Sequence, residues 1–332
     1  MSKRSVSLAR LLSLVSIATA VGVITVLLLQ GHSSAAESRA TMAAVTTSPS
    51  SGSASSGSPS ATGSGSAKPA ARTATAPAEP SAKPSAKPSA PAPAAPDAAL
   101  QGAVAQAGSS VSVSVSVTDL GTGRSLTYGA PGHAFATASI VKVDILSTLL
   151  LQAQDQGTTL SQSQRDLATT MIENSDNDSA TALWNEIGQE GGLNAANQRF
   201  GLTSTSGGTE GNWGLTTTTA ADQVRLLRQV FTSDSLLSSA SRSYIQGLLA
   251  QVESDQRWGV SAAAGGGDYA VKNGWLPRSA TGLWVINSIG MVEHDGHQLL
   301  IAVVSDGNTT EDGGISLVQS VAQAAAGSLG AG

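Results

Sequence analysis

The 332-residue sequence predicts an α+β fold, in which an antiparallel sheet is built from both ends of the folded region and flanked by helices that also form a helical subdomain. Three observations lead to this prediction. Residues 111–117 alternate valine with serine, which is the period of two of a half-buried strand. Strand-like segments return only after residue 268. The stretch between these two regions carries apolar residues mainly at helical spacing.

The expected elements follow one another with recognisable boundaries. The turn at 119–123 contains two glycines, and the turn at 294–297 reads His-Asp-Gly-His, which is typical of a tight hairpin. In chain order we expect a helix at 98–107, strands at 111–117 and 125–128, helical blocks at 139–201 and 219–252, strands at 269–272, 283–292 and 298–304, and a closing helix at 315–325.

Composition divides the chain at about residue 96. Residues 1–96 carry eight basic and two acidic side chains, whereas residues 97–332 carry ten basic and 21 acidic ones, together with all 11 aromatic residues. We therefore expect residues 97–332 to form one domain with its own core. Its acidic balance argues against a nucleic-acid partner. The absence of cysteine excludes disulfides, thiolate metal sites, thiol nucleophiles and a lipid-modified cysteine.

The first 96 residues have the composition of an export or anchoring segment followed by a linker. Residues 11–29 are uncharged and follow three basic residues, so residues 1–32 are either a cleaved signal peptide or a transmembrane anchor. Residues 33–96 consist mostly of Ala, Ser, Pro, Thr and Gly, which predicts a disordered linker. Both alternatives place residues 97–332 outside the cytoplasm, secreted or held at the membrane.

Ser139 and Lys142 form the first candidate for catalysis. They lie three residues apart at the start of a predicted helix, and Lys142 projects from the middle of a wide apolar face. Desolvation would lower the pKa of this lysine and let it accept a proton from the serine. The alternative is a lysine whose charged end simply reaches the surface.

Two further motifs each allow a structural and a functional interpretation. Ser-Asp-Asn at residues 175–177 separates two helical segments, where these residue types commonly cap a helix. Lys-Asn-Gly at residues 272–274 ends a predicted strand, where Asn-Gly is a common hairpin turn. Lys272 and Lys142 are the two lysines of residues 97–332.

Taken together, the three motifs resemble the signature of class A β-lactamases and penicillin-binding proteins. Ser-x-x-Lys, Ser-Asp-Asn and Lys-x-Gly occur in this order on a helix start, an inter-helix loop and a strand. The resemblance runs roughly from Ala98 to the C-terminus. It also includes Ile187-Gly188, Phe200-Gly201 and the threonines at 216–219 before a helix.

The resemblance implies a catalytic role for four of these residues. Ser139 would be the acylated nucleophile, and Lys142 would take part in proton transfer. Ser175 would pass a proton to the leaving nitrogen. Lys272 would support Ser175 and attract a substrate carboxylate.

The same resemblance implies the residues that bind substrate. Asn177 would hold the amide side chain of the substrate, and the third motif, with Asn273 and Gly274, would line the site. The backbone N–H groups of Ser139 and Trp275 would form the oxyanion hole.

The sequence also departs from the family pattern. Asn273 replaces the usual threonine, and the interval from Ser139 to Ser175 is shorter than in class A enzymes. The Ω-loop is truncated, so Glu210 is the candidate for the carboxylate that activates the deacylating water. Without such a base, the acyl-enzyme would persist. Arg278, in a nearby loop, is a candidate for an additional contact to a carboxylate.

The expected activity is therefore that of an exported serine hydrolase that acts on β-lactams or D-Ala-D-Ala-like amides through an acyl-serine intermediate, without a metal or organic cofactor. Its partner would be a small β-lactam or a peptidoglycan stem peptide, and we expect a monomer. Two alternatives stay open. One is a peptidoglycan DD-carboxypeptidase or transpeptidase, and the other is a non-catalytic cell-wall-binding domain of the same fold.

Overall fold

The computed structural model describes residues 92–330, and its centre is a five-stranded antiparallel sheet. The strand order is β2-β1-β7-β6-β5, so the N-terminal hairpin pairs with the C-terminal strands. This confirms the predicted sheet built from both ends of the folded region. The strands are β1 (Ser112–Asp119), β2 (Ser125–Gly129), β5 (Tyr269–Pro277), β6 (Trp284–His294) and β7 (His297–Asn308).

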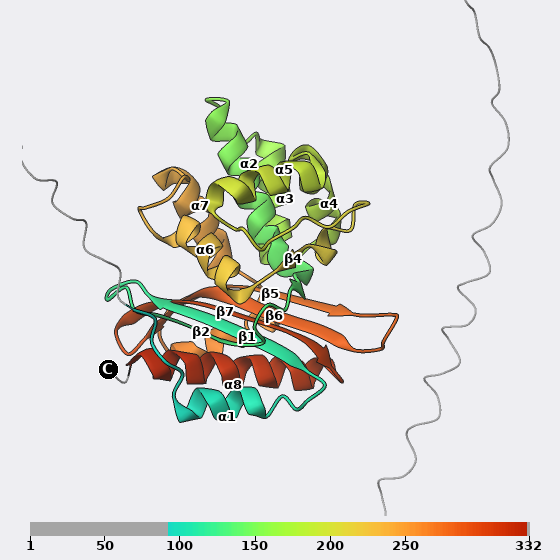
Figure 1. Ribbon diagram of the computed structural model, residues 1–332. Helices are drawn as coiled ribbons and strands as arrows, with labels where there is room; N and C mark the ends of the chain where they lie inside the picture. The colour runs from blue at the N-terminus through green and yellow to red at the C-terminus, as the bar shows by residue number, and fades with distance from the viewer. Residues whose placement is uncertain (1–91, 331–332) are drawn as a thin grey trace, which may run out of the picture. The chain divides into compact units, whose positions relative to one another are not determined.

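Helices cover both faces of the sheet. Figure 1 shows α1 (Ala98–Ala105) and α8 (Glu311–Gly330) on one face and the other helices on the opposite face. The closing helix is longer than predicted at both ends. The second helical layer contains α2 (Val141–Asp155), α3 (Gln162–Glu173), α4 (Asn177–Glu186), α5 (Gln189–Phe200), α6 (Ala220–Phe231) and α7 (Ser239–Leu249).

Short elements join the sheet to the helical layer. A two-stranded sheet pairs β3 (Phe135–Ala136) with β4 (Thr217–Thr218), so residues that are about 80 positions apart lie side by side. The 3₁₀ helix η1 (Ala138–Ile140) follows β3 and leads into α2. Three other 3₁₀ helices are η2 (Trp213–Leu215), η3 (Ser254–Gln256) and η4 (Gly259–Ala264).

The valine–serine alternation of β1 predicts one solvent-facing side, but the strand is buried on both sides because helices cover both. Its serines therefore need internal partners. The hydroxyl of Ser116 is 2.9 Å from the Thr127 hydroxyl on β2, and the Ser114 hydroxyl donates to the Tyr128 carbonyl. The period of two therefore predicted the strand correctly, but the predicted exposure of one of its sides is wrong.

Strand β5 is longer than predicted and is the outermost strand next to β6. Asn273 and Gly274 pair with Ser288 and Asn287 in the middle of the ladder, so the hairpin-turn interpretation of Asn-Gly is wrong. The chain reverses at residues 278–283 instead. The third motif consequently lies on a rigid strand at the edge of the sheet.

Helix α2 is the central helix of the second layer. Its residues from Val141 to Leu151 are all buried, including the predicted polar strip around Asp144 and Thr148. Burial raises the pKa of Asp144 to about 7, and an Asn197 amide donates to its carboxylate at 2.9 Å. A lysine on such a helix cannot reach bulk water without leaving the core.

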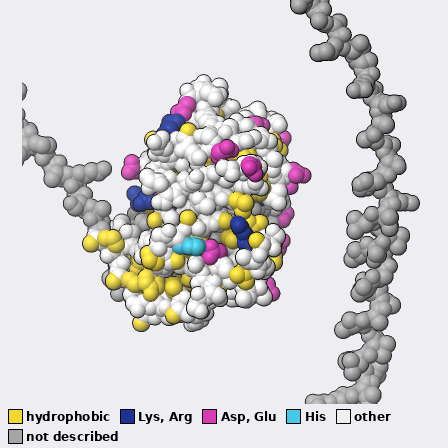
Figure 2. All heavy atoms as spheres, turned by 45° about the vertical axis from the view of Figure 1, so that its right-hand side comes forward, with side chains coloured by type: hydrophobic (Ala, Val, Ile, Leu, Met, Phe, Trp, Pro, Cys, Tyr) yellow, Lys and Arg dark blue, Asp and Glu magenta, His cyan; other side chains and the backbone are white. Residues whose placement is uncertain are grey.

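The described part of the chain has few charges on its surface. Figure 2 shows one face on which acidic side chains stand singly or in pairs among uncharged polar groups. The signal or anchor predicted at residues 1–32, and nearly all of the linker predicted at 33–96, lie outside the described residues. Within residues 92–330, no helix has the length and hydropathy needed to span a bilayer.

The helical layer depends on large buried side chains, which provides a stability test. Trp184 on α4 is fully buried, so Trp184→Ala should lower the free energy of unfolding by about 3–5 kcal/mol through the cavity it leaves. The indole nitrogen has no hydrogen-bond partner among the described residues, so Trp184→Phe should lose much less. Urea denaturation of both variants measures this difference, and equal losses would contradict the packing described.

Candidate active site

Ser139 lies on a tight turn between β3 and α2, within η1. The preceding residue, Ala138, has a left-handed backbone with φ of 47°, which is unfavourable for a residue with a Cβ. The turn is held from β6, because the Asn287 amide donates to the carbonyls of Ala136 and Thr137 at 2.8 and 2.9 Å. The serine is therefore presented on a fixed backbone at the top of the central helix.

Lys142 begins the first turn of α2 and its ammonium is surrounded by acceptors. Its Nζ lies 3.0 Å from Ser139 Oγ, 3.1 Å from Ser175 Oγ and 2.8 Å from Asn177 Oδ1. It also donates to the Ser175 carbonyl at 2.6 Å. The side chain is fully buried, so the alternative in which its charged end reaches the surface is wrong.

The Ser-Asp-Asn segment caps a helix and also contacts Lys142. Asp176 caps α4, since its carboxylate accepts the backbone N–H of Ser179 at 2.7 Å. The two flanking residues, Ser175 and Asn177, turn towards Lys142. Ser175 has a left-handed backbone with φ of 54°, which aims both its hydroxyl and its carbonyl at the lysine.

Lys272 reaches the same point from β5. Its Nζ lies 3.0 Å from Ser175 Oγ, so the Ser175 hydroxyl is between two lysines. The neighbouring Gly274 allows this approach, because a Cβ at that position would be 2.7 Å from the Ser139 nitrogen. The structure thus brings together Ser139, Lys142, Ser175 and Lys272, which come from three separate parts of the sequence.

The electrostatics of this cluster favour neutral amines. Burial lowers the pKa of Lys142 to about 7, and the carboxylate of Asp176 opposes part of that shift. Burial also lowers the pKa of Lys272 well below its ordinary value, with a further contribution from the charge of Lys142. A lysine with a pKa near 7 can accept a proton from a serine hydroxyl at neutral pH, which an ordinary lysine does rarely.

Asn273 does not face this cluster. Side chains alternate between the two faces of a strand, so Asn273 projects away from the face that Lys272 and Gly274 share. Its amide nitrogen donates to the carbonyls of Gln256 and Trp258 at 2.7 and 2.9 Å. Both amide hydrogens are therefore used to fasten the 254–264 segment. A hydrogen bond from the Asn273 amide to a substrate in the cluster would break those contacts.

The side chain of Trp275 also lies on that second face, where its ring packs edge-on against Trp258 with the centroids 6.0 Å apart. Its backbone remains beside the nucleophile turn, next to Gly274. The predicted oxyanion role requires only this backbone N–H. Asn177 is exposed and shares its Oδ1 with Lys142, so its amide nitrogen is the group that could meet a ligand.

Glu210 is not drawn into the cluster. It is exposed, its backbone is left-handed with φ of 55°, and none of the hydrogen bonds found in residues 92–330 joins its carboxylate to Ser139, Lys142 or Ser175. The ring of Trp213 lies over Lys142 instead, with Nζ 5.0 Å from the ring centroid. Arg278 lies in the turn between β5 and β6, several residues beyond the motif.

Sequence reasoning missed two residues that shape the site. Asn287 was taken as part of an apolar strand, although a buried amide within such a strand is itself a signal of a structural contact. It is fully buried, and its Oδ1 also accepts the Ser305 N–H at 3.0 Å. Trp213 lies in the short stretch between Glu210 and the threonines at 216–219, and no local pattern indicates which way its ring turns.

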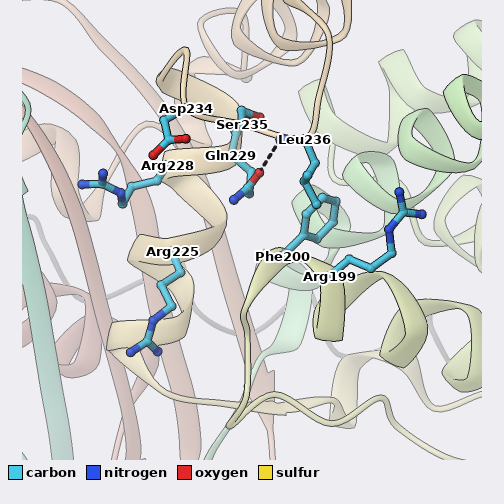
Figure 3. A pocket seen from close by; sticks show the side chains of 8 residues that line it. All are labelled: Arg199, Phe200, Arg225, Arg228, Gln229, Asp234, Ser235 and Leu236. Atoms are coloured by element: carbon cyan, nitrogen blue, oxygen red, sulfur yellow. Dashed lines mark hydrogen bonds between the residues drawn. The ribbon is translucent and has the colours of Figure 1, made fainter. Parts of the chain in front are cut away.

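A cavity of about 360 Å³ lies away from this cluster, between α5 and α6. Figure 3 shows three arginines at its rim, and their guanidinium groups point in different directions. Two of them already pair with carboxylates, Arg199 with Asp155 and Arg225 with Asp222. The cavity contains no serine–lysine pair and does not resemble a catalytic site.

Comparisons with known proteins agree with this fold. The model of the Beta-lactamase enzyme family matches residues 150–329, which is more than half of the chain. The antiparallel sheet with its flanking helices is a β-lactamase-like fold. The chain belongs to the β-lactamase enzyme family, and the predicted resemblance is confirmed. Ser139 and Lys142 precede the matched segment, so the family match does not include them.

Individual relatives are distant. The Mycobacterium tuberculosis protein LppW, which is named as a lipoprotein, is 26% identical over 191 residues. That alignment covers 56% of this chain, and the chain spans 60% of the length of LppW. The solved structure of PBP-A is 20% identical with a TM-score of 0.60, covering 72% of this chain and 99% of that one. A class A β-lactamase from Bacteroides cellulosilyticus is 16% identical with a TM-score of 0.60, covering 70% and 98%. These two structures support the fold.

The support that β6 gives to the nucleophile turn can be tested by Asn287→Ala. The change removes the Asn287 partner of the Ala136 carbonyl and of the Ser305 N–H, whereas the Thr137 carbonyl keeps the Ile140 N–H. An unsatisfied buried group costs about 1–3 kcal/mol, so the variant should lose roughly 2 kcal/mol or more of unfolding free energy. Asn185→Ala, at an exposed position on α4, is the matched control and should change stability by less than about 0.5 kcal/mol. Similar stabilities of the two variants by urea denaturation would refute the anchoring role.

Proposed function

We propose that this protein is an acyl-serine enzyme that opens β-lactams or D-Ala-D-Ala-like amides. The observation that supports this proposal best is the continuous hydrogen-bonded chain Ser139–Lys142–Ser175–Lys272. It provides a nucleophile with a base on one side and a proton route to a second hydroxyl on the other. A helix cap or a structural lysine would not require all four groups to meet.

The first chemical step is attack by Ser139. The neutral amine of Lys142 takes the hydroxyl proton while Oγ bonds to the carbonyl carbon of the substrate. The negative charge that develops on the carbonyl oxygen is stabilised by the backbone N–H groups of Ser139 and Trp275. Lys272 contributes a second buried positive charge when it is protonated.

The second step is expulsion of the nitrogen. The carbon–nitrogen bond breaks as the nitrogen receives a proton from the Ser175 hydroxyl, and Ser175 is reprotonated by the ammonium of Lys142. The proton that left Ser139 thereby reaches the leaving amine, and Lys142 returns to its neutral state. The hydroxyl of Ser175 is suited to this relay because it lies 3.1 and 3.0 Å from the two lysine nitrogens.

The acyl-enzyme is expected to persist, since the exposed Glu210 offers no base to the cluster. This favours a penicillin-binding or peptidoglycan-processing activity over efficient β-lactam hydrolysis. A structural neighbour, the PBP-A variant, is described as an acyl-enzyme complex with penicillin G, which is consistent with that expectation. We propose DD-carboxypeptidase or transpeptidase activity as the second candidate on the same observation.

We also propose an extracytoplasmic location. The name of LppW indicates a protein of the cell envelope. This sequence has no cysteine to carry a lipid, so export or attachment would depend on the uncharged segment at residues 11–29. The linker at 33–96 would then separate the enzyme from the membrane. The substrates named above occur in that compartment.

Acylation can be observed directly by intact-mass analysis. Incubation with penicillin G should add the mass of one penicillin to the wild-type protein and none to Ser139→Ala, because the hydroxyl forms the covalent bond. Ser163→Ala, at an exposed position on α3, should acylate like the wild type. An unmodified wild type, or an equal adduct on Ser139→Ala, would rule out the proposal. Turnover of nitrocefin compared with release of D-Ala from a muropeptide separates the two candidate activities.

The pH dependence of acylation tests the role of Lys142. Only the neutral amine accepts the serine proton, so the acylation rate should rise with pH and level off above the pKa of about 7. Lys142→Arg should reduce the rate by about 100-fold or more at every pH, since a guanidinium does not release its proton. A rate that is flat between pH 5 and 9 in the wild type would contradict a lysine base.

A further inference from the structure

Trp213 covers the side of Lys142 that the serines leave open. Its ring centroid is 5.0 Å from Nζ, within the range of a cation–π contact. The remaining directions around Nζ are occupied by Ser139, Ser175 and Asn177. The amine is therefore surrounded by four hydrogen-bond acceptors, two of them from Ser175, and by one aromatic face.

The position of the indole is fixed by its other contacts. Its Nε1 donates to the Thr181 hydroxyl on α4 at 3.1 Å, which ties the ring to the helix that carries Asn177. The following residue, Gly214, lies against the nucleophile turn, since a Cβ there would be 3.9 Å from the Ala138 Cα. The ring is thus held between two of the segments that form the site.

The loop that carries Trp213 is closely packed and held by its own hydrogen bonds. A Cβ at Gly208 would be 2.1 Å from the Asn212 carbonyl oxygen, and the Gly208 N–H donates to the Thr216 hydroxyl at 3.0 Å. The Leu215 N–H also donates to the Asn212 carbonyl, at 2.8 Å. This short, closely packed turn presents the indole to the lysine while the Glu210 carboxylate stays in solvent.

We propose that Trp213 is a positioning residue that excludes water from Lys142 and thereby prolongs the life of the acyl-enzyme. Hydrolysis of an acyl-serine requires a water whose oxygen bonds to the acyl carbon while a base takes its proton. Lys142 is the base nearest to Ser139, and an apolar ring offers no hydrogen bond to a water at this position. The inference rests on the proposed acyl-serine function and assigns to Trp213 the control of its second half-reaction.

Removing the ring should open that route. In Trp213→Ala, a water beside Lys142 gives its proton to the neutral amine and its oxygen to the acyl carbon, and Ser139 Oγ leaves with a proton from the ammonium. General-base assistance is worth 10²–10⁴-fold, so the half-life of the penicillin adduct should shorten by about tenfold or more. Acylation is followed separately, because the ring also contributes to the burial that lowers the pKa of Lys142, and its loss should slow acylation at neutral pH.

The experiment follows formation and decay of the penicillin G adduct by intact mass in the wild type and in three variants. Thr181→Val removes the acceptor of the indole N–H and should shorten the half-life in the same direction while leaving the ring in the chain. Leu215→Ala, an exposed position in the same turn, is the matched control and should decay like the wild type. Deacylation of Trp213→Ala should rise with pH as Lys142 loses its proton, which a merely structural role would not produce.

The outcomes separate the two proposals. If no protein forms an adduct, the proposed acyl-serine function is wrong. If adducts form and decay at the same rate in the wild type, Trp213→Ala and Thr181→Val, the role of Trp213 is wrong while the function stands. Should Trp213→Ala fail to fold, as judged by near-ultraviolet circular dichroism, Thr181→Val decides alone, and a half-life equal to that of Leu215→Ala overturns the inference.

Discussion

The site depends on one buried ammonium group. Lys142 is fully buried on the central helix, and the loss of water around its charge is offset by acceptors from Ser139, Ser175 and Asn177. Those acceptors come from two different segments, so the lysine joins the helix start to the inter-helix loop. Its environment also makes its protonated and neutral forms close in free energy near neutral pH, which a base requires. The burial of Lys142 therefore has two effects. It joins the helix start to the inter-helix loop, and it lowers the lysine pKa to a value that suits a base.

The rest of the fold fixes the positions of the residues around Lys142. The sheet presents Lys272 and Gly274 on an outer strand, and Gly274 allows that strand to approach the Ser139 backbone. Asn287 fastens the nucleophile turn to the next strand. Residues 97–332 have two lysines, and arginine supplies the other Lys/Arg cations of this region. Both lysines of this region lie where the proposed chemistry needs a cation that can lose its proton, which arginine does not do.

The sequence predicted the sheet from both chain ends because alternation in 111–117 and the late strands are local signals. It also indicated the meeting of Ser139, Lys142, Ser175 and Lys272, since three motifs in one order are far more specific than any one alone. Asn273 was misjudged because its place in the motif was given more weight than strand alternation, which puts it on the face opposite Lys272. The ring of Trp213 could not be oriented from sequence, because its direction is decided by contacts with Thr181 and the nucleophile turn.

The central claim is that Lys142 is a neutral amine in a substantial fraction of molecules at neutral pH. The most direct measurement is an NMR titration of the protein labelled with ¹³C at lysine Cε, with the Lys142 signal identified by its loss in Lys142→Arg. The account predicts a midpoint near pH 7 for this signal. A Lys142 midpoint above about pH 10 would contradict the account.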